Sequence, residues 1–214
     1  MSGQFLFALD AEADAYLVAL NDGRVFIVET SAVTRAPLRT IDQTRSVCEL
    51  NFDGSSACLV ADDRALLEQT ILRGRAVQAA DTLGAAQCML DQAVGYSLER
   101  EQFNRVVGSF QAVKHMCAEM ASQLEPCRAF VWYAGHAFDG RTNDAAFTAC
   151  HVKAHLAEVG QFVAKTSTEV HGGMGFTDLV GLHYWFKRIG FNRQMLGSPE
   201  AVRNEVAMRQ GLCG

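Results

Sequence analysis

The sequence predicts a mainly α protein, in which a helical bundle follows a small β region. Three observations support this prediction. Before residue 61, short segments alternate apolar and polar residues, as half-buried strands do. After residue 61, apolar residues repeat at alternating spacings of three and four along three long stretches, which is typical of helices packed at shallow angles. An Asn-Asp-Gly sequence at residues 21–23 lies between two apolar segments and indicates a β-hairpin.

The β region is expected to contain a few short strands. Residues 16–20 and 25–29 flank the Asn-Asp-Gly turn, whose residue types tolerate positive φ. Residues 46–52 form another alternating segment. A set of only a few strands buries too little apolar surface to be stable alone. These strands are therefore expected to pack against another part of the protein. We therefore place one boundary in the chain, between a β portion (1–61) and a helical bundle (62–214).

The helical region is expected to hold about five helices. Asp62 and Asp63 open the first, because the helix dipole favours negative charge at an N-terminus. Gly140 ends the second helix, and Asn143 or Asp144 can cap the third. The three long apolar stripes run through residues 72–93, 110–138 and 149–170.

Two shorter helices complete the predicted bundle. One is expected over residues 178–193. The last begins where Ser198 can cap and Pro199 fits the first turn. Within the second stripe, Pro126 is expected to kink the helix or to interrupt its hydrogen bonds.

Bulk composition excludes several classes of function. The 214 residues have a net charge of −5 with acids and bases mixed, so no basic surface for nucleic acid is expected. No apolar run reaches the roughly eighteen residues of a membrane span, and no secretory signal is recognisable. The seven cysteines form no Cys-x-x-Cys pair, which favours a reducing, cytoplasmic location over disulfides or zinc. His151 and His155 lack a third ligand nearby, so no metal site is predicted.

The junction between the first two long helices holds the residues of greatest chemical interest. Arg100, Gln102 and Phe103 lie between the two helical patterns. A guanidinium offers a planar fork to phosphate oxygens. The following helix is expected to start near Ser109, and its free N–H groups favour a nearby negative charge. Such a junction can hold an anionic, partly aromatic ligand. An ordinary helix–helix turn with surface charges is the alternative.

Two motifs, one at this junction and one about seventy residues later, resemble the acyl-CoA dehydrogenase family. The first begins at Tyr96 and continues through Arg-x-Gln-Phe to Phe-Gln-x-Val-Lys-His at residues 110–115. The second is His-Gly-Gly-Met-Gly-Phe-Thr at residues 171–177. The resemblance covers nearly all of this chain but only about the latter half of the family architecture. It corresponds to the end of the middle β-domain and the C-terminal helical domain, and the preceding helical domain is expected to be missing.

The resemblance implies a flavoprotein that binds FAD at a subunit interface. The residues implied to contact the ADP half of a neighbour's FAD are Arg100, Gln102, Phe103, Phe110, Gln111, Glu169, Gly172 and Gly173. Glycine suits such a place because it lets the backbone approach the cofactor. Glu169 stands where the family usually has glutamine, and its carboxylate would repel phosphates unless protonated or turned away. The alternative is that these residues have only a packing role.

The resemblance also implies that this chain supplies no catalytic residue. The family removes the α-proton of an acyl-CoA while hydride leaves the β-carbon for the flavin, so a carboxylate base is needed. The usual base position holds Leu196, and a less common one, on the first long helix, holds Gly74. Phe5 and Phe7 stand where the family has a flavin-contacting Trp-x-Thr, and Phe7 has no hydroxyl to donate.

These departures favour a degenerate subunit. It would take part in α,β-dehydrogenation of an acyl-CoA substrate, such as a fatty acyl or steroid side-chain thioester. Its expected partner is a full-length acyl-CoA dehydrogenase subunit in a hetero-oligomer, with self-association as the other possibility. Two further hypotheses stay open. The chain is either a non-catalytic oligomerisation partner that has lost flavin binding, or a fragment of a longer acyl-CoA dehydrogenase.

Overall fold

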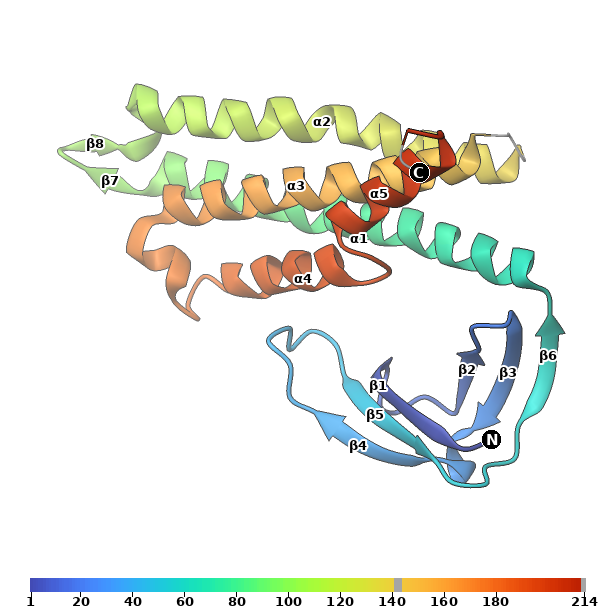
Figure 1. The fold of residues 1–214 in the computed structure, drawn as a ribbon. Coiled ribbons are helices and arrows are strands. Elements are labelled where there is room, and N and C mark those ends of the chain that lie inside the picture. The colour runs from blue at the N-terminus through green and yellow to red at the C-terminus, as the bar shows by residue number, and fades with distance from the viewer. Residues whose placement is uncertain (141–143, 213–214) are drawn as a thin grey trace. The chain divides into compact units, whose positions relative to one another are not determined.

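A computed structural model describes residues 1–140 and 144–212 (Figure 1). The chain divides into two compact units, one ending at Ile71 and the other beginning at Leu72. The first is built mainly of strands and the second of long helices. The fold class predicted from the sequence is therefore confirmed. We retain the boundary between residues 61 and 62 as a proposal for where the β-domain ends, since the first helix begins at Arg64.

Six strands lie within residues 1–71, all of which are described. They are β1 (Gly3–Leu9), β2 (Ala15–Ala19), β3 (Arg24–Glu29), β4 (Thr34–Leu38), β5 (Val47–Phe52) and β6 (Cys58–Asp62), with a 3-10 turn, η1 (Thr30–Ala32), before β4. They form two antiparallel three-stranded sheets, ordered β1-β5-β4 and β2-β3-β6. The predicted hairpin is present, because β2 pairs with β3 from Ala15 opposite Glu29 to Ala19 opposite Val25.

The strands enclose a small apolar core. Its buried members are Ala8, Tyr16, Val28, Cys48, Leu50 and Phe52. The Tyr16 hydroxyl donates to the Asp10 carbonyl at 2.9 Å, so its polar end is satisfied beside this core. The rings of Phe5 and Phe7 on β1 are instead exposed.

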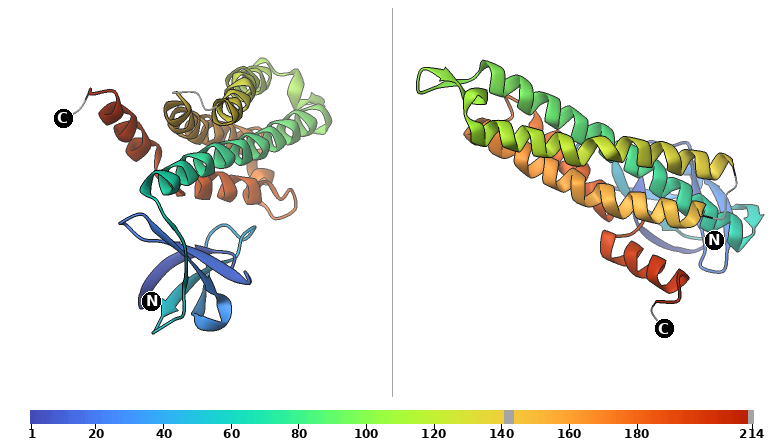
Figure 2. Two further views of the ribbon diagram at one scale, coloured as in Figure 1. Left: turned by 90° about the vertical axis from the view of Figure 1, so that its right-hand side faces the viewer. Right: turned by 90° about the horizontal axis from the view of Figure 1, so that it is seen from above.

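The second unit is a bundle of long helices. In chain order its elements are α1 (Arg64–Glu99, whose first two turns fall in the first unit), β7 (Glu101–Gln102), β8 (Arg105–Val106), η2 (Val107–Ser109), α2 (Gln111–Asp139), α3 (Ala145–His171), η3 (Gly172–Phe176), α4 (Leu182–Gln194) and α5 (Pro199–Arg209). The axes of α1, α2 and α3 run side by side in both views of Figure 2. Their shared core includes Met89, Leu124, Leu156, Val163 and Ile189.

Several predicted helix ends are confirmed. Gly140 follows α2. Pro126 lies inside α2, which continues past it, and the predicted kink there stays a prediction. Ser198 caps α5 by accepting a hydrogen bond from the Ala201 N–H at 3.3 Å, with Pro199 in the first turn.

Other helix ends differ from the prediction. Helix α1 begins at Arg64, so Asp62 and Asp63 precede it and no acid lies in its first turn. Asp63 caps the helix by accepting a hydrogen bond from the Ala65 N–H at 2.8 Å. The shorter helix begins at Leu182 rather than at residue 178, because Gly181 has φ +68° and cannot continue a helix backwards. Asp144 precedes α3 without a side-chain cap, and it accepts from the Tyr133 hydroxyl at 2.6 Å instead. Asn143, the alternative cap, lies outside the described residues.

Gly160 of α3 sets the closest approach within the bundle. A Cβ at this position would lie 2.6 Å from Thr82 Cγ2 of α1 and 3.3 Å from Ile189 Cγ2 of α4. Thr82 cannot easily move, because its hydroxyl donates to the Gln78 carbonyl at 2.9 Å and accepts from Asn192 at 3.1 Å. Only glycine therefore fits this crossing.

We expect Gly160→Ala to lower the free energy of unfolding by about 2 kcal/mol, the typical cost of an overpacked core. Gly84→Ala is the matched control, since a Cβ there meets nothing within 4 Å. It should raise stability by about 0.5–1 kcal/mol, because alanine favours a helix over glycine. Urea denaturation of both variants measures the two effects. Equal effects of the two substitutions would show that the crossing is not tight.

Candidate functional site

A short hairpin joins α1 to α2. Strands β7 and β8 pair across Phe103 and Asn104, whose φ angles are +52° and +61°. The Val107 N–H donates to the Arg100 carbonyl at 2.7 Å and closes the base of the hairpin. Helix α2 begins at Gln111, two residues later than the predicted Ser109, because residues 107–109 form the 3-10 turn η2.

The C-terminal ends of α1 and α3 meet beside this hairpin and leave a hollow of about 420 Å³. Its lining residues are Tyr96, Arg100, Gln102, Val107, Val170, His171, Gly172, Gly173 and Met174. The structure therefore brings together four of the eight residues that the resemblance implies as FAD contacts: Arg100, Gln102, Gly172 and Gly173. We call this space the junction hollow.

One edge of the junction hollow is cationic and the other is bare backbone. The Arg100 side chain is exposed and forms no ion pair with any described residue. Across from it, α3 ends at His171 and Gly172 adopts φ +57°, a conformation that other residues rarely adopt. A Cβ at Gly172 or Gly173 would meet nothing within 4 Å, so both glycines border open space.

The other four predicted residues do not line the junction hollow. Phe103, at the hairpin tip, is 87 % exposed. The Phe110 ring lies 3.9 Å from the Arg105 guanidinium and contacts Phe103 edge-on. Gln111 is exposed at the start of α2. Glu169 is also exposed, and its carbonyl, rather than its carboxylate, accepts the Gly172 N–H.

Leu196 and Gly74, the two residues that the resemblance assigns to base positions, pack against each other. A Cβ on Gly74 would lie 2.6 Å from Leu196 Cδ1, so the leucine side chain fills the space above Gly74. Leu196 has φ +56° in the segment between α4 and α5. The place therefore holds an apolar side chain, which cannot accept a proton.

The carboxylates nearest in sequence to Leu196 are engaged elsewhere. Glu200 pairs with Arg193 at 2.8 Å. Glu205 pairs with Arg75 at 2.8 Å and with Arg209 at 3.0 Å. Burial raises the pKa of Glu205, but the two guanidinium groups outweigh it and hold the pKa below its usual value. A carboxylate with a lowered pKa is a weak base, so neither acid suits proton abstraction.

Two buried cations donate to backbone carbonyls, one in the segment that contains Leu196 and one in the last turn of α4 before it. Arg75 Nε donates to the Leu196 carbonyl at 2.9 Å, and its Nη1 lies 3.1 Å from Cys150 Sγ. Lys153 is 3 % exposed and donates to the carbonyl of Asn192, in the last turn of α4. Burial, helped by the positive charge of Arg75 and Arg193, lowers the pKa of Lys153 to about 8.

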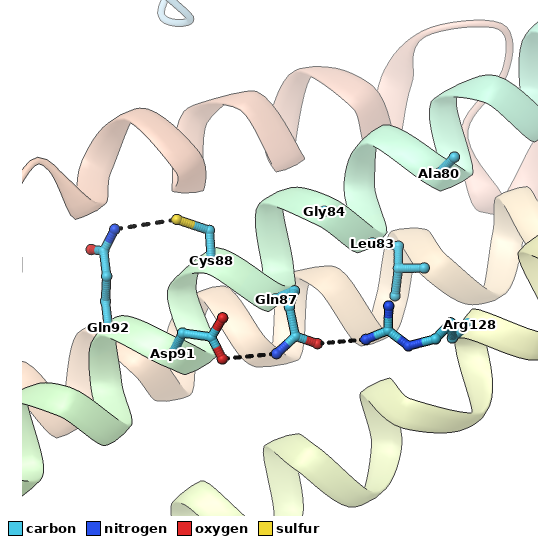
Figure 3. A pocket seen from close by; sticks show the side chains of 8 residues that line it. All are labelled: Ala80, Leu83, Gly84, Gln87, Cys88, Asp91, Gln92 and Arg128. Atoms are coloured by element: carbon cyan, nitrogen blue, oxygen red, sulfur yellow. Dashed lines mark hydrogen bonds between the residues drawn. The ribbon is translucent and has the colours of Figure 1, made fainter.

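A second hollow of about 650 Å³ lies along α1 (Figure 3). Gln87 donates to Asp91 at 2.9 Å and accepts from Arg128 of α2 at 3.1 Å, so these three polar groups satisfy one another. None of the predicted site residues lines it. Its chemistry is that of a polar helix–helix contact rather than of a ligand site.

The described residues also show two absences. They contain no group of three or more His, Cys, Asp or Glu side chains placed to hold a metal ion. Among them, no helix has both the length and the apolar character that crossing a membrane requires.

The comparisons with known proteins agree with this architecture. A relative from Mycolicibacterium smegmatis, named acyl-CoA dehydrogenase IpdE2, is 29% identical over 193 residues, or 90% of this chain and 58% of the relative. The caffeyl-CoA reductase-Etf complex subunit CarC of Acetobacterium woodii is 33% identical over 108 residues, or 50% of this chain and 28% of that protein. A solved steroid ACAD named Tcur3481-Tcur3483 superposes with a TM-score of 0.88 at 26% identity, over 98% of this chain and 59% of its own.

This chain therefore spans less than two thirds of the length of each of these proteins. The family model described as acyl-CoA dehydrogenase, C-terminal domain, matches residues 64–211, which include both sequence motifs and nearly all of the helical bundle. The chain belongs to the acyl-CoA dehydrogenase family.

Proposed function

We propose that this chain is a flavoprotein subunit for α,β-dehydrogenation of an acyl-CoA thioester, and that it contributes the ADP side of an FAD site in a hetero-oligomer. The observation that supports this most strongly is the junction hollow, where Arg100 faces a side-chain-free glycine turn. A guanidinium with no ion pair in the described structure is available to a pyrophosphate, which it can bind through two parallel hydrogen bonds. Gly172 and Gly173 let the ligand approach the backbone.

The partner subunit would supply the base and the flavin-ring contacts. Leu196 and Gly74 leave no carboxylate at either base position of this chain. One relative is named as a subunit of a complex, the caffeyl-CoA reductase-Etf complex, which is consistent with a multi-subunit assembly. In this arrangement the chain binds and orients the cofactor. When FAD is bound, its flavin would accept the hydride.

We expect Arg100→Ala to weaken ADP binding to the full chain at least tenfold, because hydrogen bonds to charged groups contribute about 1.5–3 kcal/mol each. Arg105→Ala is the matched control. Its guanidinium lies over the Phe110 ring, and it does not line the junction hollow, so ADP affinity should change less than about threefold. Isothermal titration of both variants measures the difference.

The same assignment has a readout in flavin absorbance. Protein co-expressed and co-purified with a full-length acyl-CoA dehydrogenase subunit should be yellow, and Arg100→Ala should release the flavin during gel filtration. If the wild-type chain binds no ADP and the co-purified complex is colourless, the chain is a non-catalytic oligomerisation partner instead.

A further inference from the structure

A stacked ring pair in the junction hollow has no role in the proposal so far. Tyr96 of α1 and His171 of α3 place their ring centroids 4.6 Å apart at an interplanar angle of 29°. Both residues line the hollow, although His171 is only 3 % exposed. A buried imidazole at the wall of a ligand-sized space offers a polar atom to whatever binds there.

The hydrogen bonding of His171 fixes which nitrogen carries the proton. Its Nδ1 lies 2.7 Å from the Ser167 carbonyl oxygen. A carbonyl oxygen only accepts, so Nδ1 carries a proton and donates, and the tautomer of the neutral ring that fits this contact has its lone pair at Nε2. In the part of the chain that the structure describes, Nε2 has no hydrogen-bond partner. In this neutral tautomer the ring presents an acceptor at Nε2.

The ring is also held in place from two helices. Ser167, whose carbonyl binds Nδ1, is itself buried and donates its hydroxyl to the Met89 carbonyl of α1 at 2.8 Å. Tyr96 stacks on the same ring one turn before Arg100. Gly172 follows His171 directly in the chain. The imidazole is thus fixed between the cationic edge and the glycine edge of the hollow.

We propose that His171 Nε2 accepts a hydrogen bond from a sugar hydroxyl of the nucleotide, and that Tyr96 positions the ring. This rests on the proposed function, because it names the part of the same ligand that the neutral acceptor contacts. Phosphate oxygens are themselves acceptors and do not suit a neutral Nε2, whereas a ribose hydroxyl donates. Arg100 then binds the phosphates and His171 selects for the sugar attached to them.

Three substitutions at His171 separate this contact from a structural role. His171→Gln places an amide acceptor near the position of Nε2. His171→Asn keeps a donor near the position of Nδ1, and His171→Phe keeps only the ring that stacks on Tyr96. ADP and inorganic pyrophosphate are titrated into the wild-type chain and each folded variant, with circular dichroism as the check on folding.

We expect the Phe and Asn variants to bind ADP about three- to tenfold more weakly, the effect of one lost neutral hydrogen bond. The Gln variant should bind ADP within about twofold of wild type, and pyrophosphate affinity should change less than twofold throughout. Tyr96→Leu removes the stacked ring and should weaken ADP binding while pyrophosphate affinity changes less than twofold, because the imidazole then loses the group that positions it.

Three results would overturn the sugar contact. The first is ADP binding that the Asn variant retains and the Gln variant loses, which would assign the effect to the hydrogen bond with the Ser167 carbonyl. The second is equal ADP affinity in wild type and the Phe variant. The third is an equal loss of affinity for ADP and for pyrophosphate. A wild-type chain that binds neither ADP nor pyrophosphate instead contradicts the proposed function itself.

Discussion

Replacing Arg75 by methionine is expected to lower the free energy of unfolding by about 3 kcal/mol, because it leaves buried partners without their donor. Three groups lose a contact together: the Leu196 carbonyl, Cys150 Sγ and the Glu205 carboxylate. The Arg75 side chain is only 9% exposed. Burial alone would lower the pKa of Arg75, but the contacts with Glu205 and Cys150 reverse this and raise it, so the guanidinium stays charged.

Arg203→Met is the matched control for this prediction. Arg203 pairs with Glu158 at 2.6 Å, slightly closer than Arg75 to Glu205, but both side chains are nearly half exposed. An exposed ion pair contributes less than about 1 kcal/mol, since water screens it. Urea denaturation of the two variants therefore compares the same substitution in a buried and an exposed setting. A loss below 1 kcal/mol for Arg75→Met would show that the segment before α5 does not depend on this guanidinium.

The three apolar stripes were enough to predict the bundle from the sequence. Spacings of three and four over residues 72–93, 110–138 and 149–170 place one face of each helix in a shared core, and Leu156 and Val163 are fully buried there. The start of α4 was misplaced for a local reason. Asp178 is a residue type that often begins a helix, but Gly181 adopts positive φ and interrupts the pattern. The sequence alone does not show which φ a glycine will adopt.

The junction hollow was partly predictable. The motifs named Arg100, Gln102, Gly172 and Gly173, and their meeting depends on α1 and α3 ending at the same place, which periodicity alone does not establish. The sequence indicated His171 only as part of a motif and gave it no separate role. Nothing in its sequence context shows that its Nδ1 is committed to a carbonyl.

The packing around Leu196 could not be predicted from the sequence, because it too depends on contacts between distant parts of the chain. The sequence identified Leu196 and Gly74 as two separate base positions without a carboxylate. It could not show that the leucine side chain lies over Gly74, or that Arg75 holds the Leu196 carbonyl. These contacts join residues more than a hundred positions apart, and no local pattern records them.

The stability of this protein is expected to rise with pH between about 8 and 10.4 through Lys153. Burial first, and then the charges of Arg75 and Arg193, lower the pKa of Lys153 to about 8 in the folded state. An unfolded lysine has a pKa of about 10.4. Between these values the unfolded state binds more protons, so raising the pH favours folding. The full change is about 3 kcal/mol, and below pH 8 the cost of burying the charge is fully present.

Lys153→Met tests this directly. At pH 7 the variant should be about 1–2 kcal/mol more stable than wild type, since removing a buried charge outweighs the lost hydrogen bond to the Asn192 carbonyl. Above pH 10 the order should reverse, because the neutral lysine then keeps that bond at no charge cost. The difference between the two proteins is the relevant quantity, since Cys127 and Cys150, whose thiol pKa values burial raises, titrate in both. A difference that stays constant from pH 7 to 10.5 would mean that Lys153 reaches water in the folded protein and is not neutralised by its surroundings.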